Sequence, residues 1–413
     1  MPSSSGPNTL VESNLVFAYD TSDVSNSYRG QPTTNIGNNF RDFTGTSYSP
    51  DGEWVSTEPT RFTKTYYPNL NTPIGPGATL IQESGTGGYH HLSRYGGSNE
   101  SGAHSLSCYI YPLVSGITDF CIGMLGDSNN NIRFNLDTRA ITYGGGISNT
   151  NAFIRDVPGW PGWLRVGANI EGRGGGWVGC FGYTSYTTYT GTAGGKRAYI
   201  TGIQYEYTTQ PTSFVAGTRS VTQGLLPLIG NSTVDLSNVS FNSNAQVLWD
   251  GTDDTLAISD TVTHKPNTSF TYEIVFKPLG GGTFYDKMLI GKPGWHTGIM
   301  YQYSTIWFRT RYGSPAFYDT SGYSVTQGNY YHAVATYTSN TSMKFYVNGT
   351  LIGENNSVTT PLFDIGNTLN IGGSSVNYSS YVEIPVVRNY NKALSAQEVK
   401  QNYQQYKTRF NLS

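Results

Sequence analysis

Short stretches of alternating apolar and polar residues recur along the whole chain, separated by turns rich in Gly, Asn and Pro. This two-residue period is typical of half-buried β-strands, and the turn residues favour tight antiparallel connections. The pattern therefore predicts an all-β protein. The expected strands are residues 15–20, 105–111, 120–125, 132–136, 163–168, 198–206, 271–278, 305–310, 331–337, 343–347 and 369–371.

A hairpin is predicted around Asn348-Gly349, near the C-terminal end. Asn and Gly tolerate the two positive φ angles of a type I′ turn, whose twist matches that of the flanking strands. In such a hairpin Val347 lies opposite Thr350, and Phe345 lies opposite Ile352.

One α-helix is expected, directly after the last strand. Ser395 and Glu398 have the spacing of a capping box, in which each side chain bonds the backbone N–H of the other residue. Val399, Tyr403 and Tyr406 follow at helical spacing and would share one buried side.

Composition fits this pattern and narrows the class of protein. Among 413 residues there are 50 Gly and 32 Tyr, 13% are charged and 37% are hydrophobic, which is enough apolar surface for a core. The length suits two domains. A net charge of −2 without a long basic run argues against nucleic-acid binding. Since no apolar run reaches about 18 residues and the start lacks a signal-peptide pattern, we expect no membrane partner and synthesis in a cytoplasm.

Several segments of the C-terminal half carry a family resemblance. They are the strand around His332, the strand end Val347-Asn348-Gly349, the strand end Ile371-Gly372-Gly373 and the closing run 384–410. Together they resemble the concanavalin A-like lectin/glucanase superfamily in its laminin G-like form, and the closing run is most similar to virion proteins of large tailed bacteriophages. The resemblance implies an antiparallel β-sandwich.

The first strand of such a sandwich is separated from its continuation. Residues 15–20, followed by Tyr28-Arg29-Gly30, resemble the opening of the phage laminin G-like proteins, but the expected Asp-Gly-x-Asp-Asp strand end comes only at Asp250–Asp254. The gap predicts a second domain inserted at a loop, because loop tips tolerate insertion. The expected parts are an N-terminal arm of residues 1–13, a laminin G-like sandwich of residues 14–35 plus 220–413, and an inserted domain of residues 36–219. Two domains in series after an arm are the alternative.

The end of the intervening segment has its own signature. Gln204-Tyr205-Glu206 closes an expected strand and Pro211-Thr212-Ser213 follows it. This ending resembles the last strand of jelly-roll, carbohydrate-binding-module-like domains in phage tail and fibre proteins. The expected fold class is therefore all-β, with two antiparallel β-sandwiches of jelly-roll type and one short C-terminal α-helix.

The superfamily that the chain resembles includes β-glucanases, so the sequence must be checked against the motif of a glycosidase. A retaining glycosidase needs two carboxyl groups about 5 Å apart, which these enzymes place on one strand as Glu-x-Asp-x-x-Glu. The chain has no such motif, and Glu273 stands alone among aromatic and aliphatic residues. We expect no enzyme and assign no catalytic residue.

Metal and cofactor binding have weak sequence signals. The acidic segment Asp250–Asp254 could ligate calcium, or its Asp and Gly residues could simply form a turn, and both explanations stay open. Cys108, Cys121 and Cys180 lack metal-ligand spacing and are expected as buried apolar residues. No cofactor and no metal site are predicted.

Glycan binding is the favoured chemistry, since sandwich lectins stack sugars on exposed aromatic rings beside hydrogen-bonding groups. Trp295, His296 and Trp160 lie in Gly/Pro-rich segments and are predicted to bind glycan, with packing at the sandwich rim as the other explanation. The strand tryptophans are predicted to lie in the core: Trp163, Trp249 and Trp307.

The expected function is that of a non-enzymatic structural or adhesion protein in a tailed phage virion, as a capsid decoration, capsid fibre, neck or tail-fibre component. Its expected partners are other virion proteins, with host-surface polysaccharide and further copies of the chain as additional candidates. The alternatives are a free carbohydrate-binding lectin or accessory module, and a polysaccharide-degrading enzyme.

The N-terminal arm is polar and is expected to be disordered in the free protein. We expect residues 1–13 to become ordered only against a neighbouring chain. Deleting residues 2–13 should therefore leave the melting transition unchanged.

Overall fold

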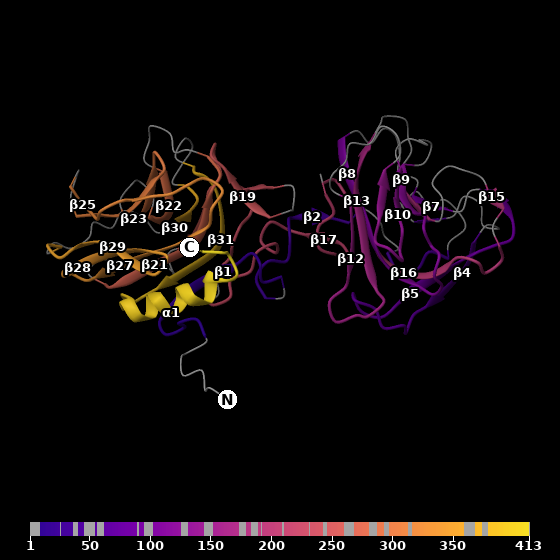
Figure 1. Ribbon diagram of the computed structural model, residues 1–413, viewed down its shortest axis with the longest axis horizontal. Helices are drawn as coiled ribbons and strands as arrows, with labels where there is room; N and C mark the ends of the chain where they lie inside the picture. The colour runs from indigo at the N-terminus through magenta and orange to yellow at the C-terminus, as the bar shows by residue number, and fades with distance from the viewer. Residues whose placement is uncertain are drawn as a thin grey trace. The chain divides into compact units, whose positions relative to one another are not determined.

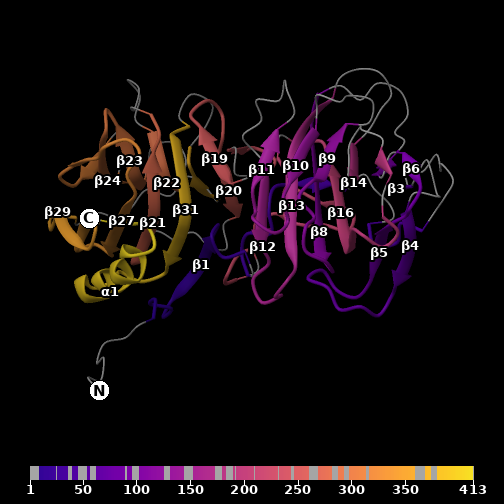
Figure 2. The ribbon, with the colours of Figure 1, turned by 45° about the vertical axis from the view of Figure 1, so that its right-hand side comes forward.

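The chain forms two compact units of antiparallel β-sheet in a computed structural model (Figures 1 and 2). Unit 1 comprises Met1–Pro32, Ser220–Asn242 and Gln246–Ser413, and unit 2 comprises Thr33–Arg219 and Ser243–Ala245. The structure describes residues 9–24, 26–35, 40–44, 54–55, 62–88, 91–94, 102–124, 131–143, 152–172, 179–182, 189–190, 192–208, 210–230, 232–242, 246–259, 268–280, 287–292, 297–312, 316–358, 368–373 and 379–412.

Unit 1 contains an eight-stranded and a seven-stranded sheet. The eight-stranded sheet has the order β18-β19-β31-β21-β27-β28-β29, with β1 also paired to β31. Its strands are β1 (Leu15–Asp20), β18 (Ser240–Phe241), β19 (Val247–Asp250), β21 (Phe270–Pro278), β27 (Tyr331–Thr338), β28 (Ser342–Val347), β29 (Thr350–Asn355) and β31 (Tyr381–Tyr390).

The seven-stranded sheet has the order β20-β30-β22-β23-β24-β25, with β26 also paired to β24. Its strands are β20 (Leu256–Ser259), β22 (Lys287–Lys292), β23 (Thr297–Gln302), β24 (Thr305–Arg311), β25 (Phe317–Asp319), β26 (Tyr323–Ser324) and β30 (Thr368–Ile371). Residues from both sheets form one buried core cluster, for example Ile274 and Phe345 with Ile299 and Phe308. Unit 1 is thus a β-sandwich.

The first strand lies in the sheet that contains the C-terminal strands. In β1, Tyr19 is opposite Val387 of β31, and β31 is joined through β21 to β27. This pairing confirms the strand placement that the split sequence pattern predicted.

The β28–β29 hairpin confirms its predicted turn but not its whole register. Asn348 and Gly349 have φ angles of 48° and 74°, and Val347 is opposite Thr350. Phe345 lies opposite Gly353, so its predicted pairing with Ile352 is wrong. A bulge between Phe345 and Tyr346 shifts the register, as one unpaired residue in a strand does.

The strand end Ile371-Gly372-Gly373 is explained by Trp249 beneath it. The Trp249 ring is fully buried and donates its Nε1–H to the Ile371 carbonyl at 3.0 Å. Gly372 has a φ of 81°, and a Cβ atom there would overlap the indole ring. Glycine is therefore required where the strand end crosses this tryptophan.

Helix α1 (Ala396–Lys407) begins with the predicted capping box of Ser395 and Glu398, which is confirmed. Val399, Tyr403 and Tyr406 lie on its buried side, also as predicted, together with Asn402. Val399 packs against Val334 of β27, so the helix covers the face of the eight-stranded sheet that points away from the core (Figures 1 and 2). No helix of the described residues is long and apolar enough to cross a membrane.

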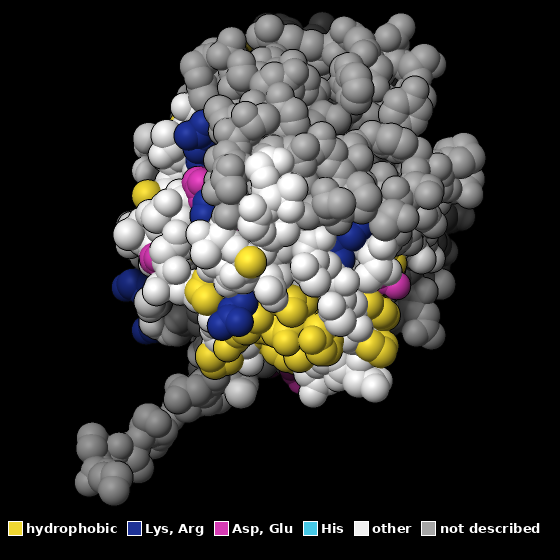
Figure 3. Space-filling view, turned by 90° about the vertical axis from the view of Figure 1, so that its right-hand side faces the viewer, with side chains coloured by type: hydrophobic (Ala, Val, Ile, Leu, Met, Phe, Trp, Pro, Cys, Tyr) yellow, Lys and Arg dark blue, Asp and Glu magenta, His cyan; other side chains and the backbone are white. Residues whose placement is uncertain are grey.

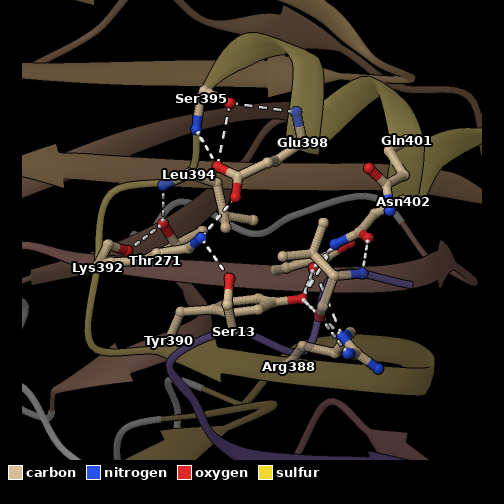
Figure 4. A network of polar contacts seen from close by, with 12 residues as sticks. Ser13, Thr271, Arg388, Tyr390, Lys392, Leu394, Ser395, Glu398, Gln401 and Asn402 are labelled. Atoms are coloured by element: carbon tan, nitrogen blue, oxygen red, sulfur yellow. Dashed lines mark hydrogen bonds and ion pairs between the residues drawn. The ribbon is translucent and has the colours of Figure 1, made fainter. Parts of the chain in front are cut away.

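A buried polar network lies between this helix and the sheet (Figure 4). The Glu273 carboxylate accepts hydrogen bonds from Asn402 Nδ2 at 2.8 Å and from the Tyr390 hydroxyl at 3.0 Å. His332 Nε2 lies 2.7 Å from Glu273 Oε1, and Arg388 Nε lies 3.9 Å from Glu273 Oε2. Glu273 is completely buried, so these partners replace the water that it loses.

The N-terminal residues that the structure describes are ordered against this network, which corrects the expectation of disorder for that part of the arm. Val11 is buried, its N–H donates to Asn402 Oδ1 at 2.8 Å, and its carbonyl accepts from Arg388 Nη2 at 2.7 Å. Gln401 Nε2 donates to the Thr9 carbonyl at 2.7 Å. The chain's own helix thus supplies the contacts that were expected from a neighbouring chain. Residues 1–8 lie outside the described residues.

Unit 2 contains two six-stranded sheets and two short ribbons. The sheet orders are β11-β10-β9-β14-β7-β3 and β12-β13-β8-β16-β5-β4, and the ribbons pair β15 with β6 and β17 with β2. The strands are β2 (Thr33–Thr34), β3 (Trp54–Val55), β4 (Phe62–Tyr67), β5 (Ala78–Glu83), β6 (Gly87–Gly88), β7 (His91–Arg94), β8 (Gly102–Pro112), β9 (Phe120–Met124), β10 (Asn131–Phe134), β11 (Ile141–Tyr143), β12 (Phe153–Asp156), β13 (Leu164–Gly172), β14 (Gly179–Gly182), β15 (Tyr189–Thr190), β16 (Arg197–Glu206) and β17 (Thr218–Arg219).

The two six-stranded sheets enclose a separate core, in which Ile110 of β8 and Ile200 of β16 meet Phe120 and Ile122 of β9. Cys108 and Cys121 are buried, as predicted, and the Cys180 side chain lies outside the described residues. Both units are antiparallel β-sandwiches, and the predicted all-β class with one short helix is confirmed.

The Gln204-Tyr205-Glu206 motif holds the segment that leaves β16. Gln204 Nε2 donates to the Thr212 and Ser213 carbonyls at 3.3 and 3.2 Å. The Glu206 carboxylate accepts from the Thr212 hydroxyl at 2.6 Å and from its N–H at 3.0 Å. The motif and the Pro-Thr-Ser exit therefore form one buried clamp.

Candidate functional site

The predicted glycan-binding residues fall in two different places. Trp160 is half-buried in the turn between β12 and β13, where its N–H donates to the Val157 carbonyl at 3.0 Å. Trp295 and His296 lie outside the described residues, in the connection between β22 and β23. The binding roles of all three stay predictions.

The ends of the β22–β23 connection are fixed in the seven-stranded sheet, next to a row of residues on its outer face. Cross-strand neighbours in this row are Asn370, Gly291, Gly298, Arg309 and Asp319, in that order. Directly opposite residues share one face of a sheet. Their chain neighbours point into the core, so this row points away from it.

The two glycines leave the middle of the row without side chains. A Cβ atom on Gly291 would lie 2.6 Å from the Gly298 Cα, so the strands approach too closely for a side chain. On one side of the glycines lies Asn370, which is buried and whose Oδ1 has no hydrogen-bond partner among the described residues. On the other side lies Arg309.

Trp307 stands on the same outer face, two residues along β24 from Arg309 of this row, and its predicted place in the core is wrong. Residues 305–311 alternate strictly between half-buried and buried, and Ile306 and Phe308 are the core residues. Trp307 therefore points outward and is half-buried. Trp249 lies in the core cluster of unit 1, as predicted, and Trp163 is buried but is not part of the core cluster of unit 2.

Arg309 is fixed between aromatic rings and a carboxylate. Its guanidinium lies 5.5 Å from the ring centre of Trp307 and 4.9 Å from that of Phe317. Its Nε and Nη2 donate to the two Asp319 carboxylate oxygens at 2.9 and 3.1 Å. Stacking and a bidentate ion pair together preorganise the side chain.

This arrangement, the Trp307 surface, consists of Trp307, Arg309, Phe317 and Asp319. It combines an apolar ring face with fixed donors and with a carboxylate of which 41% is exposed. The charges of Arg309 and Asp319 cancel, so the surface is chemically suited to an uncharged polyol such as a sugar.

The sequence contained the signal for this surface. Ile306, Phe308 and Thr310 set the buried side of β24, and the period of two places Trp307 and Arg309 on the other side. Asp319 could not be found in that way, because its position opposite Arg309 depends on the pairing of β24 with β25.

The acidic turn after β19 was the candidate metal site. Asp250, Asp253 and Asp254 each have a carboxylate oxygen within 4.8 Å of the others. Two of these carboxylates serve the turn itself: the Asp250 N–H donates to Asp254 Oδ2 at 2.6 Å, and the Thr252 N–H donates to Asp250 Oδ1 at 2.8 Å.

The surroundings of this turn already contain a cation from the protein. Lys287 Nζ donates to the Gly251 carbonyl at 3.4 Å and to the Ser379 carbonyl. Burial raises the pKa of Asp254 above its ordinary value, against hydrogen bonds from Asp250 and Ser240 that lower it. These contacts favour the turn explanation, and the cluster is exposed at Asp250 and Asp253.

Comparison with known proteins bears on unit 1. The family model described as the concanavalin A-like lectin/glucanases superfamily matches residues 250–400. The match supports a concanavalin A-like lectin domain in unit 1. The Trp307 surface and the acidic turn both lie within the matched residues. No curated protein sequence matches the chain.

Solved structures give only distant likenesses. The receptor binding domain of botulinum neurotoxin D has a TM-score of 0.38 and 11% identity, over 45% of this chain and 51% of that chain. The botulinum neurotoxin serotype D ligand binding domain in complex with N-acetylneuraminic acid has a TM-score of 0.37 and 12% identity, over 45% and 49%. The binding domain of Paraclostridial Mosquitocidal Protein 1 has a TM-score of 0.35 and 12% identity, over 42% and 49%. The chain spans about half the length of these structures, and likenesses at this level indicate no ligand.

Proposed function

We propose that this protein is a non-enzymatic structural or adhesion protein of a tailed-phage particle, and that unit 1 binds uncharged glycans of the host surface through Trp307. The observation that carries the glycan proposal is the outward Trp307 ring beside the Arg309–Asp319 ion pair. A pyranose ring can stack on the indole face while its hydroxyls bond the carboxylate and the guanidinium.

The chemistry of Glu273 supports a binding role over a catalytic one. Glu273 is the acid that the sequence places on a central strand, and it is fully buried with four polar partners. A glycosidase carboxylate must reach the glycosidic bond. Glu273 is therefore explained as part of the network under α1.

The glycan proposal is tested with a glycan array probed by the full chain and by Trp307→Ala. We expect the wild type to bind uncharged glycans. Trp307→Ala should raise the Kd about tenfold, because one aromatic stacking contact is lost. Tyr303→Ala is the matched control, because Tyr303 is a 58% exposed aromatic residue at the tip of the β23–β24 hairpin. Equal binding by Trp307→Ala and wild type would refute the site.

The particle assignment is supported by the resemblance of residues 384–410 to phage virion proteins. Proteomics of purified particles is its test, and we expect the protein at a fixed copy number per particle. Its presence in the lysate but not on particles would favour the runner-up, a free carbohydrate-binding lectin.

A further inference from the structure

A row of aromatic side chains crosses the outer face of one sheet in unit 2. Tyr111 of β8 is directly opposite Tyr199 of β16. The Trp163 ring lies 5.6 Å from Tyr111 at one end, and the Tyr67 ring of β4 lies 5.4 Å from Tyr199 at the other. We call these four residues the aromatic row.

The core of unit 2 does not account for the tyrosines in this row. Cys108 and Ile110 of β8, and Ala198 and Ile200 of β16, alternate with the row and fill the core. Tyr111 and Tyr199 point the other way and are half-buried, and Tyr67 is 39% exposed. Figure 3 looks onto the side of unit 2 where β4 and β5 lie and shows hydrophobic side chains gathered into a continuous patch.

The row continues to the turn that carries Trp160. Gly162 in this turn has a φ of 82°, and a Cβ atom there would lie 2.6 Å from the Tyr111 ring. The turn therefore rests directly on Tyr111, and a residue with a side chain would push the ring away. This packing connects the predicted Trp160 segment with the row.

Polar side chains run beside the row on the same face. Arg197, Gln82 and Thr63 lie opposite one another on three neighbouring strands. This polar line is parallel to the line through Tyr199 and is displaced from it by two residues along each strand. Arg197 and Thr63 are exposed and Gln82 is half-buried. Rings with hydroxyl tips, flanked by donors and acceptors, fit a ligand that alternates apolar ring faces with hydroxyl groups.

We propose that the aromatic row is a second carbohydrate site, which binds an extended polysaccharide chain along Tyr111, Tyr199 and Tyr67. The Tyr67 and Tyr199 rings are 5.4 Å apart, and Tyr111 lies directly opposite Tyr199, so successive sugar residues of one chain can meet successive side chains. A polysaccharide is favoured over a protein partner because a dry protein interface would leave the Arg197–Gln82–Thr63 line without partners.

The proposal for the aromatic row does not depend on the proposal for the Trp307 surface, so an experiment can refute either one alone. The experiment uses the full chain carrying Trp307→Ala, which removes the contribution of unit 1. Affinity gel electrophoresis in hydroxyethylcellulose, dextran or alginate measures retardation of the protein. We expect retardation by at least one polysaccharide, and an about tenfold weaker apparent affinity when Tyr67→Ala and Tyr199→Ala are added.

Two further variants control for folding and for exposure. Tyr143→Ala removes a 40% exposed tyrosine from the other sheet of unit 2 and should leave retardation unchanged. Tyr199→Phe keeps the ring and should retain most of the affinity. The proposal is overturned if none of the three polysaccharides retards the protein, or if the Tyr67/Tyr199 double variant is retarded as strongly as its parent. Loss of binding to a particle protein in that double variant, without any polysaccharide binding, would assign the row to a protein partner.

Discussion

Glu273 shows how a single carboxylate can organise the outer side of a sandwich. Burial by itself raises its pKa, but the hydrogen bond and charge of His332, the charge of Arg388 and the Tyr390 hydroxyl together lower the pKa below its ordinary value. A carboxylate with a lower pKa in the folded state stabilises the fold above its unfolded pKa. That contribution is lost as the pH falls through the folded pKa. The unfolded pKa of Glu is about 4.3, so the network should weaken only in acid.

Glu273→Gln tests this network. The amide keeps the shape but removes the negative charge that faces Arg388, and breaking a buried pair in this way typically costs about 3 kcal/mol. We expect a lower Tm at pH 7, and a smaller loss of Tm between pH 5 and pH 3 than in the wild type. Thermal melts at each pH measure both.

Glu354→Gln is the matched control for that substitution. Glu354 pairs with Lys344 at 3.5 Å with both side chains well exposed, and such surface pairs contribute at most about 1 kcal/mol. A Glu273→Gln protein that melts like the Glu354→Gln protein would show that the buried network adds no stability.

Residue-scale prediction succeeded where one residue type has one physical use. Asn348 and Gly349 are the residues that tolerate positive φ, and the turn was predicted from them alone. Tyr303 and Ser304 also have positive φ angles, of 46° and 61°, at the β23–β24 turn. Neither Tyr nor Ser favours a positive φ angle, so the tertiary structure imposes this conformation and the local sequence does not predict it.

At the scale of elements, the N-terminal segment and helix α1 stabilise each other. Thr9 and Val11 bond to Gln401 and Asn402 of the helix, and Lys392 Nζ donates to the Ser13 hydroxyl at 2.6 Å (Figure 4). The sequence could not show this, because the segment has few apolar residues and its backbone groups find their partners almost 400 residues away. The capping box was predictable because both of its residues lie within one helical turn.

Deleting residues 2–13 should therefore lower the stability of unit 1. The deletion removes the apolar contacts of Leu10 and Val11. It also leaves Arg388 without its acceptor, the Val11 carbonyl, and Asn402 Oδ1 without its donor, the Val11 N–H. Each unsatisfied buried group costs about 1–3 kcal/mol. We expect a lower Tm for the deletion, measured by calorimetry. A deletion of residues 2–8 removes none of these contacts and is the matched control. Equal melting of the two deletions would show that the contacts contribute nothing.

At the scale of the whole molecule, the chain is organised so that unit 2 can be regarded as an insertion into unit 1. The chain leaves unit 1 after Pro32 and returns to it at Ser220. Close to this gap, the N–H groups of Arg29 and Gly30 both donate to the Gly224 carbonyl. In unit 2, β2 pairs with β17, so its two ends also lie side by side. Each of the two large core clusters takes its residues from one unit.

This organisation predicts that residues 33–219 can be replaced by a short Gly-Ser turn without unfolding unit 1. Since Arg29 and Gly30 before the gap are already bonded to Gly224 after it, a short turn closes the gap at little entropic cost. We expect the shortened chain to melt in one cooperative transition, and residues 33–219 alone to melt in another. By binding assays, the Trp307 site should stay with the first product and the aromatic row with the second. A shortened chain without a cooperative transition would instead show that unit 1 needs unit 2 to fold, and that the insertion model describes the path of the chain but not its stability.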